Sequence, residues 1–480
     1  MDALHELTAL ELRDRLRSGD LTPTEVTEHF LSRIAERNDE LGAFSTVTPD
    51  LARARAATLG PPSGLLWGVP TGDKDLWNRA GVPTGFGSRA MQGFVPEESD
   101  EVVQHLDAAG VVSLGKTNAP ELGFPAYTEP VVGPVTRNPW DLTRGAGGSS
   151  GGAAAAVAAG LVPFAAGSDG GGSVRIPAAA CGVVGLKPSR GLLPAGSGIE
   201  APGGLVVDGP LARTTADTAL LLEGMLARHR DGSARHPYTL RTPVAPEGAY
   251  LAAAQRGAAP GRDSGRFRIG VTTWSAWEDY YDITVAPEAR AALDAGMSAL
   301  AGLGHDVEDH TWAPAPEYGD AFRSLWMAGA SAVPIDDDDV LDRLEPLTSW
   351  LIRRGRQVPA RELVEALRTL TAFERRLIAG FGDLDVVVTP ALAMTPRPLG
   401  WFDAEDPDHN FAQQCRYTPF TSWLNVAGLP AITVPTHWTD DGLPMGIQVI
   451  GRPGGELTLL AVAAQLEDVL RWPDRRPPVW

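Results

Sequence analysis

Two clusters of glycine and serine constrain the fold of this chain more than any other feature of its sequence. One cluster spans residues 147–152 (GGSSGG) and the other residues 168–173 (SDGGGS), and the alanine-rich run between them is long enough for one helix. Glycine adopts backbone angles that other residues avoid, at an entropic cost that a merely structural segment has little reason to bear. Either cluster alone is compatible with an ordinary turn. Two clusters that each contain or end at serine predict a backbone folded tightly around a nucleophile.

Lysine is almost absent from this chain. Of its 41 basic residues only Lys74, Lys116 and Lys187 are lysine. Arginine stays charged in proteins, whereas a buried lysine can lose its proton. We therefore hypothesise that a lysine kept in so arginine-rich a chain serves as a base. Compositional drift is the alternative, but it would scatter the three lysines, and all of them lie between residues 74 and 187.

The overall composition excludes several classes of function. A chain of 480 residues has room for about three average domains, although large α/β enzymes often stay undivided. The net charge of -19 argues against unassisted binding to nucleic acid or to an anionic membrane, and leaves neutral and cationic small molecules open. Cys181 and Cys415 form no CxxC pair, so neither a zinc site nor a disulfide framework is predicted, and we expect no metal or cofactor. Without a signal peptide or an apolar run of membrane-spanning length, the protein is predicted to be soluble and cytoplasmic.

Hydrophobic periodicity and capping signals predict alternating helices and strands. The clearest helix start is Thr22–Glu25, a capping box with proline at the first helical position. Helices are predicted at residues 8–18, 22–37, 49–57, 100–109 and 287–303, and strands at residues 110–117, 266–271 and 383–389. This alternation is typical of the α/β class.

Two short motifs are expected to be coincidental. Residues 110–117 match the phosphate-loop pattern GxxxxGK[ST], and Ser113 to Lys116 also match SxxK. A phosphate loop needs a strand before its first glycine and a helix after its lysine, but here a helix comes before and Pro120 blocks an immediate helix. The SxxK match lacks the SDN and KTG motifs that accompany it in penicillin-binding proteins.

A third motif, GxSxG around Ser149, matches the nucleophile elbow of α/β-hydrolases. The elbow needs a strand directly before it, and residues 138–144 are expected to form a poor one. It also needs a histidine, and all nine histidines lie outside residues 106–228. Because triads assemble from residues far apart in sequence, this argues against the elbow without excluding it.

Lys74 lies in GVPTGDKDL, where turn residues bracket a short extended segment. On one interpretation it is a surface lysine paired with Asp73 or Asp75. On the other it is buried near the serines and largely neutral. Burial would lower the pKa of its ammonium and the two aspartates would raise it, so the sequence leaves the balance open.

Together these segments resemble the amidase signature family. The resemblance rests on the segment around Lys74, on GGSSGG, and on GSDGGGSVR (167–175), which Ile-Pro (176–177), Cys-Gly (181–182) and GLKP (185–188) follow. The opening helices and residues 420–451 also resemble that family. The resemblance implies one α/β/α domain over residues 1–480, with a large mixed, twisted central sheet covered by helices and a signature core at residues 60–215.

The resemblance also implies a Ser-Ser-Lys triad. Ser173 corresponds to the nucleophile, Ser149 to a bridging serine that follows a cis peptide bond, and Lys74 to the general base. Asp169 and Arg175 correspond to positions that brace the loop, and Ser150 to a supporting position. The oxyanion is expected to bind the backbone N–H groups of Gly170, Gly171, Gly172 and Ser173. Lys116 and Lys187 are assigned structural roles, and Cys181 is expected to be a small buried residue.

The implied activity is hydrolysis of a carboxamide C–N bond, through an acyl-enzyme, to a carboxylate plus ammonia or an amine. The partner is then a small-molecule amide, which the sequence does not name; a homodimer is compatible with the chain. The alternatives are a glutamine-hydrolysing amidotransferase subunit, a hydrolase of cyclic or oligomeric amides, and a catalytically dead binding module. The intact triad residues count against the last.

Three positions depart from the commoner family pattern. Asp73 stands where an apolar residue is usual and Leu76 where asparagine often follows, which leaves the pKa of Lys74 open. Gly170 replaces a bulkier residue, and this is expected to enlarge the acyl pocket. The KDL form at residues 74–76, together with LGKTNAPELG and TRNPWD, resembles the branch that contains hydrolases of cyclic amide dimers more than it resembles transamidation subunits.

Two further segments carry expectations. Residues 229–266, rich in Arg, Pro, Gly and Ala, are predicted to be an exposed excursion. Residues 310–360 are predicted to shape the substrate pocket. Their aromatic residues would line it, or would be the core of a helical lid whose acidic run, residues 336–339, forms a solvated turn. These aromatic residues are Trp312, Tyr318, Phe322, Trp326 and Trp350.

Overall fold

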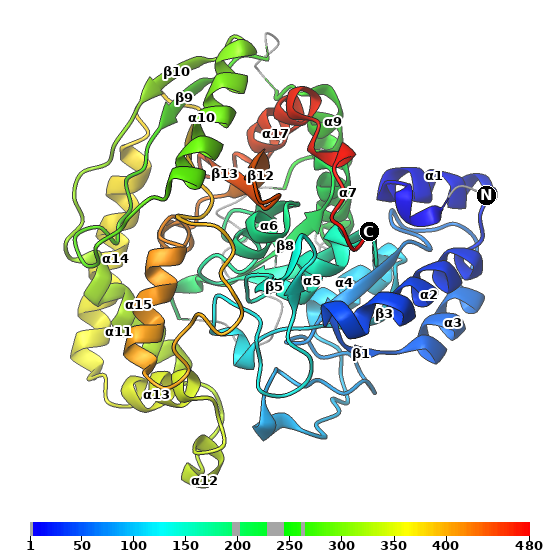
Figure 1. The fold of residues 1–480 in the computed structure, drawn as a ribbon, viewed down its shortest axis with the longest axis horizontal. Coiled ribbons are helices and arrows are strands. Elements are labelled where there is room, and N and C mark those ends of the chain that lie inside the picture. The colour runs from blue at the N-terminus through cyan, green and yellow to red at the C-terminus, as the bar shows by residue number, and fades with distance from the viewer. Residues whose placement is uncertain (1–2, 194–201, 228–243, 261–264) are drawn as a thin grey trace.

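The computed structural model describes residues 3–193, 202–227, 244–260 and 265–480, and a large mixed sheet runs through its middle (Figure 1). Its strands are β6 (Phe164–Asp169), β7 (Val184–Lys187), β8 (Val207–Ala212), β9 (Arg268–Val271), β10 (Asp306–Asp309), β11 (Val386–Pro390), β12 (Ala431–Trp438) and β13 (Pro444–Gly451). They are ordered β10-β9-β11-β13-β12-β7-β8-β6. β9 runs parallel to β10 and β11, and the other neighbours are antiparallel. The mixed central sheet confirms the predicted fold class.

A smaller sheet brings the lysine-bearing strand to the edge of the large one. It consists of β1 (Phe44–Val47), β3 (Val112–Thr117) and β2 (Pro70–Lys74), with β3 in the middle. β2 lies against β6, and the Thr71 hydroxyl donates to the Phe164 carbonyl over 3.2 Å. Lys74, the last residue of β2, therefore lies beside the C-terminal end of β6.

The segment before the first glycine cluster forms more strand than predicted. β4 (Arg137–Asn138) and β5 (Asp141–Gly145) pair as a short antiparallel hairpin that ends two residues before Gly147. The expectation of a poor strand over residues 138–144 was wrong for residues 141–144, which belong to β5. The hairpin stands apart from the large sheet, so no strand of that sheet leads into Ser149 as a nucleophile elbow requires.

Helices cover the sheets and join them. The described helices are α1 (Ala9–Ser18), α2 (Pro23–Leu41), α3 (Pro49–Thr58), α4 (Glu101–Ala109), α5 (Gly151–Ala158), α6 (Arg175–Cys181), α7 (Thr215–Met225), α9 (Ala249–Arg256), α10 (Pro287–Gly302), α11 (Tyr318–Ala330), α12 (Asp338–Leu341), α13 (Pro346–Gly355), α14 (Ala360–Ala379), α15 (Pro407–Tyr417), α16 (Ser422–Ala427) and α17 (Glu456–Leu470). The predicted capping box is present, because the Thr22 side chain accepts from the Glu25 N–H and Glu25 accepts from Thr22. Among the helices of the described ranges, none is both long and apolar enough to cross a membrane.

Neighbouring side chains of β13 face opposite sides of the sheet, one toward the hydrophobic core and the other toward the glycine-serine turn. Ile447 and Val449 pack into one hydrophobic cluster with side chains of α10 and α17. Gln448 lies between them in sequence and therefore faces the other side of the sheet, where its amide donates to Thr389 and to the Phe420 carbonyl. The strand thus carries a polar side chain on the face that α6 and α16 approach.

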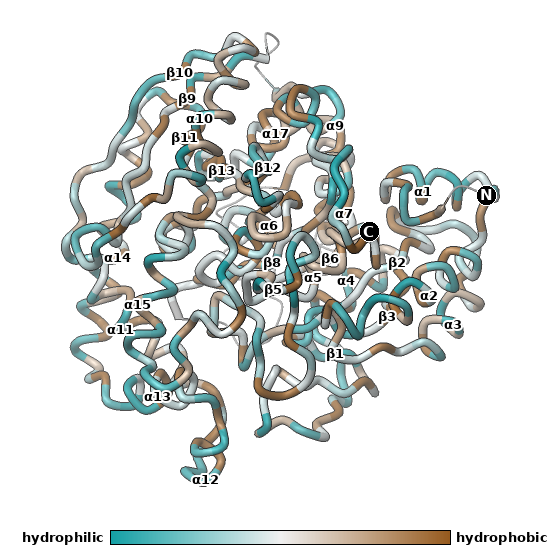
Figure 2. Tube along the Cα trace, viewed as in Figure 1, coloured by the Kyte–Doolittle hydropathy of each residue, from teal (hydrophilic) through white to brown (hydrophobic). Residues whose placement is uncertain are grey.

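A second hydrophobic cluster lies between α11, α13, α14 and α16 and contains much of the chain's aromatic content. In Figure 2 hydrophilic and hydrophobic stretches alternate along α11 and α14, as expected of helices with one buried face. These helices follow β10 in sequence, and Trp326 of α11 lies close to Gly170, the residue after β6.

The segment 229–266 differs from the expected exposed excursion where it is described. Residues 228–243 and 261–264 lie outside the described residues. Helix α9, in the described part, packs against α7 and α17 and buries Tyr250, Ala253 and Ala254. The spacing of these three residues forms an apolar stripe, so this part of the segment is packed and not exposed.

Candidate active site

Lys74 is fully buried at the end of β2, which excludes the interpretation as a surface lysine. Its Nζ lies 2.9 Å from Ser149 Oγ, 2.9 Å from Ser168 Oγ and 3.2 Å from the Ser168 carbonyl oxygen. Burial lowers the pKa of Lys74 to about 7, although the charges of Asp169 and Asp208 act in the opposite direction. Lys74 therefore loses its proton far more readily near neutral pH than an exposed lysine does.

The three contacts of Lys74 determine how a neutral amine is hydrogen-bonded at this position. An unprotonated lysine has two N–H donors and one lone pair, whereas an ammonium has three donors. The Ser168 carbonyl can only accept, so one of the two hydroxyl groups must donate to the lone pair when Lys74 is neutral. Ser149 is therefore within direct proton-transfer distance of a base.

The acids beside Lys74 in sequence do not interact with its amine. Asp73 is fully buried, pairs with Arg79 over 2.6 Å and accepts from Ser113, so the pKa of its carboxyl is lowered. Asp75 accepts from Ser45 and from the Gly85 N–H. Because side chains alternate across a strand, both acids point away from the face that Lys74 occupies. The departure at Asp73 therefore leaves the amine of Lys74 free of a direct ion pair.

Ser149 lies between the β5 hairpin and α5, and the peptide bond between Gly148 and Ser149 is cis. The backbone here is closely packed, because a Cβ on Gly148 would lie 2.5 Å from the Tyr127 nitrogen. The Thr128 hydroxyl donates to the Gly147 carbonyl over 2.8 Å. These contacts hold the Ser149 hydroxyl toward Lys74.

Ser173 is partly exposed in the turn between β6 and α6. Gly172, directly before it, has φ +134°, and a Cβ there would lie 2.5 Å from Thr421 Oγ1. Only glycine fits this position without moving its neighbours. The Ser150 N–H donates to the Ser173 carbonyl over 3.1 Å, so the two glycine clusters are hydrogen-bonded to each other.

One of the four backbone N–H groups that were expected to bind the oxyanion already has a hydrogen-bond partner. The Gly172 N–H donates to Asp169 Oδ1 over 2.8 Å, and so that donor is already used. Within the described residues no hydrogen bond is recorded for the N–H groups of Gly170, Gly171 and Ser173. These three amides stay available near the hydroxyl of Ser173.

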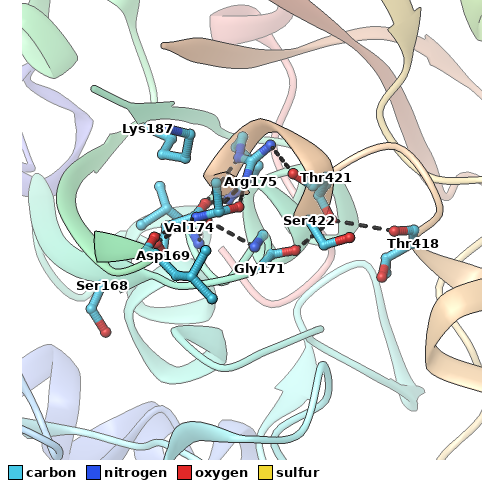
Figure 3. A network of polar contacts seen from close by, with 12 residues as sticks. Ser168, Asp169, Gly171, Val174, Arg175, Lys187, Thr418, Thr421 and Ser422 are labelled. Atoms are coloured by element: carbon cyan, nitrogen blue, oxygen red, sulfur yellow. Dashed lines mark hydrogen bonds and ion pairs between the residues drawn. The ribbon is translucent and has the colours of Figure 1, made fainter. Parts of the chain in front are cut away.

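A fully buried ion pair fixes this turn (Figure 3). Arg175 donates to both oxygens of Asp169, over 2.9 and 2.8 Å, and holds the pKa of that carboxyl well below its usual range. The same guanidinium donates to Gln448, Asn425 and the Thr421 carbonyl. Sequence reasoning placed Asp169 and Arg175 in a bracing role but missed Asn425, Gln448 and Thr421, which lie inside the segment 420–451 that carried part of the family resemblance.

Beside Ser173 lies a pocket whose walls include five aromatic side chains. Its lining residues are Phe124, Ala126, Gly171, Ser173, Ile176, Trp277, Phe322, Trp326, Phe411, Gln414, Cys415, Thr418 and Ser422. Two of the five candidate aromatic residues, Phe322 and Trp326, belong to it. Trp312 and Tyr318 lie in the hydrophobic core instead, and residues 336–339 are exposed. The aromatic residues of 310–360 are thus divided between the walls of this pocket and the hydrophobic core.

Apart from Ser173, the hydroxyl and amide side chains that line this pocket are hydrogen-bonded to other protein groups. Gln414 accepts from the Ala126 N–H and donates to Asn410. Ser422 accepts from the Trp277 indole over 2.9 Å and is hydrogen-bonded to the Tyr318 hydroxyl. No lining residue of the pocket carries an ionisable group other than Cys415, and burial raises the pKa of that thiol. The pocket therefore suits an uncharged group.

The other lysines have structural contacts, as predicted. Lys116 donates to the Trp77 carbonyl and to Thr84, and Lys187 donates to the Pro188 carbonyl over 3.0 Å. Cys181 is buried on α6. In the described part of the chain no group of three His, Cys, Asp or Glu side chains is arranged to hold a metal ion.

Ser168 is the contact of Lys74 that sequence reasoning missed. It stands at the start of the second glycine-serine cluster, and its hydroxyl and carbonyl both accept from the lysine. The signal was present in the cluster itself, which begins and ends with serine.

Comparison with known proteins gives one consistent match. The family model named Amidase matches residues 25–460. The putative amidase AmiB2 of Mycobacterium tuberculosis is 38% identical over 475 residues, which cover 97% of this chain and 96% of that protein. The solved structure of 6-aminohexanoate cyclic dimer hydrolase is similar with a TM-score of 0.87 and 31% identity, over 99% of both chains. A bacterial aryl acylamidase of the amidase signature family is similar with a TM-score of 0.83 and 27% identity, again over 99% of both chains.

Replacing Arg175 by alanine is expected to destabilise the protein by about 3–5 kcal/mol, because Asp169 would remain buried and charged without its partner. Urea unfolding measures this. The matched control is Arg53→Ala, which removes an exposed pair with Glu28 and should change the stability far less, because solvent screens that pair. Equal costs for the two variants would show that the buried pair does not hold the turn.

Proposed function

This chain belongs to the amidase signature family and is an amidase, and from that premise we propose that it hydrolyses a carboxamide C–N bond through an acyl-enzyme on Ser173. The observation that carries the proposal is the 2.9 Å contact between the buried Lys74 amine and the Ser149 hydroxyl. A serine hydroxyl needs a neighbouring base to become a nucleophile, and Lys74 is the base that this site offers.

The proposed proton path runs from Ser173 through Ser149 to Lys74. As Ser173 Oγ attacks the amide carbon, its proton passes to Ser149 Oγ and the Ser149 proton passes to Lys74 Nζ. The tetrahedral intermediate collapses when the same relay returns a proton to the leaving nitrogen, which departs as ammonia or an amine. Water, deprotonated by the same path, then attacks the acyl-enzyme and releases the carboxylate.

The carbonyl oxygen becomes negative as the intermediate forms. We assign its stabilisation to the N–H groups of Gly170, Gly171 and Ser173, since the Gly172 N–H is bound to Asp169. The loss of one such donor in other hydrolases costs about 3 kcal/mol. The bond between Gly172 and Asp169 keeps the three donors in position.

We propose that the substrate is a neutral amide with an apolar acyl group. The aromatic walls of the pocket and its internally bonded polar groups favour such a substrate. The similar structures include a hydrolase of a cyclic amide dimer and an aryl acylamidase, which is consistent with this class. Glutamine hydrolysis is the weaker candidate, because glutamine carries two charges and none of the residues that line the pocket could pair with them.

We also propose that residues 1–480 act as one amidase domain with its signature core at residues 60–215, of which residues 194–201 lie outside the described residues. The proposal is supported by contacts between segments that lie far apart in the sequence. The Trp480 indole donates to Glu6 over 2.6 Å, and the network around Arg175 joins the core to α16 and β13.

The triad is tested by single substitutions. We expect Ser173→Ala to lower kcat/KM for the best neutral amide by at least about 10⁴-fold, and Lys74→Ala and Ser149→Ala by at least about 10²-fold, with KM little changed. Lys187→Ala, an equally buried lysine outside the relay, is the matched control and should affect stability more than kcat. Activity that survives the loss of Ser173 or Lys74 would contradict the proposed mechanism.

The pH dependence follows from the pKa of Lys74. A general base acts in its unprotonated form, so kcat/KM should rise about tenfold per pH unit below pH 7 and level off above it. A midpoint near that of an ordinary lysine, about 10.4, would contradict a base whose pKa is lowered by burial.

The substrate class is tested with a neutral aryl amide, a cyclic amide and glutamine. We expect both neutral amides to be hydrolysed and glutamine not to be. Trp326→Ala should lower kcat/KM for the aryl amide by about tenfold or more through lost apolar contact. Trp438→Ala, another partly buried tryptophan outside the pocket, should leave it within about twofold. A preference for glutamine would favour the amidotransferase role instead.

A further inference from the structure

Asp208, on β8, is a buried acid that the mechanism above does not use. Only 1% of it is exposed, and within the described part of the protein neither carboxylate oxygen has a hydrogen-bond partner. Burial raises the pKa of this carboxyl well above its ordinary value, whereas the charge of Lys74 acts to lower it. A buried polar group without a partner is costly, so its presence needs an explanation.

The strand register places Asp208 on the same face of the sheet as the contacts of Lys74. β6 and β8 are antiparallel, and Asp208 lies directly opposite Ser168. Side chains that are directly opposite share a face, with Cβ atoms about 4.5–5.5 Å apart. The Ser168 hydroxyl accepts from Lys74 Nζ over 2.9 Å, so the Asp208 carboxyl is a near neighbour of the amine.

The other charges in this region are already balanced or lie farther out. Asp169 on β6 is paired with Arg175, and Asp73 on β2 is paired with Arg79. Helix α5, which packs on β8, has no ionisable side chain. On β7, Lys187 is bound to the Pro188 carbonyl. On α7, Asp217 is bound to the N–H groups of Ala9 and Leu10, and Glu223 is bound to the Tyr250 N–H. Asp100 and Glu101, at the start of α4, act on Asp208 through their charge.

We propose that Asp208 is a positioning residue for the catalytic base, whose negative charge stabilises the ammonium form of Lys74 and so balances the charge that Lys74 gains from Ser149. The three atoms that contact Nζ are neutral oxygens, which solvate an ammonium but do not neutralise it. A carboxylate nearby on the same face lowers the cost of the charged intermediate. The two groups then titrate as a coupled pair. This inference rests on the proposed role of Lys74 as the base.

Asp208→Asn keeps the size of the side chain and removes its charge. Since that charge raises the pKa of Lys74, the substitution should lower this pKa, by about one unit for a near but indirect contact. The chain has only three lysines, so protein labelled with ¹³C at lysine Cε gives three signals, and Lys74→Ala assigns the one of interest. This titration needs no substrate and therefore does not depend on the proposed reaction.

Asp217→Asn is the matched control, because Asp217 is equally buried but is held by backbone N–H groups of α1 and is not among the charges that act on Lys74. It should leave the Lys74 titration in place even if it lowers stability. Asp208→Asn should fold well, since no hydrogen bond recorded in the described structure is lost. Asp208→Val, which suits a buried strand, provides a second variant with the same expected shift.

Two results together support the proposal. The Lys74 signal should titrate about one unit lower in Asp208→Asn, and the acid limb of kcat/KM should move in the same direction by the same amount. An unchanged Lys74 titration in both Asp208 variants would overturn the proposal whatever the activity. A shifted titration with an unmoved acid limb would also overturn it, because Lys74 would then not be the base that limits the reaction.

Discussion

The site depends on one buried ion pair, between Asp169 and Arg175. The carboxylate accepts from the backbone of Gly172 and Val174, while the guanidinium bonds to Gln448, Asn425 and the Thr421 carbonyl. Taking two charges out of water is expensive, and such a pair is stable only when its remaining donors and acceptors are satisfied. Here they are satisfied by the turn that carries Ser173 and by segments about 250 residues further along the chain. The nucleophile turn and the C-terminal half are therefore held by the same contacts.

The last two residues of β6 divide the site between two faces. Neighbouring residues of a strand point in opposite directions, so Ser168 faces Lys74 while Asp169 faces Arg175. The base and the nucleophile turn are thus fixed by adjacent positions of one strand. A shift of the β6 register by one residue would exchange the two side chains and disrupt both contacts.

The sequence specified the local features better than the spatial ones. Capping boxes, the α/β alternation and the unusual glycine-serine clusters depend on neighbours in the chain, and the structure contains them. That Lys74 meets Ser149 came only from family resemblance, because 75 residues separate them and spacing carries no such information. The aromatic residues show the same limit. Phe322 and Trp326 share a helical stripe with Tyr318, yet that stripe passes from core to pocket along one helix, and periodicity does not locate the change.

A lowered pKa alone would not have identified the base. Lys187 is as deeply buried as Lys74, and its pKa is also lowered to about 7. Its amine, however, donates to the Pro188 carbonyl, an oxygen that has no proton to give. Lys74 touches two hydroxyl groups, and one of them belongs to the serine that follows the cis peptide bond. Burial lowers the pKa of both lysines, but only Lys74 contacts a serine hydroxyl whose proton it can accept.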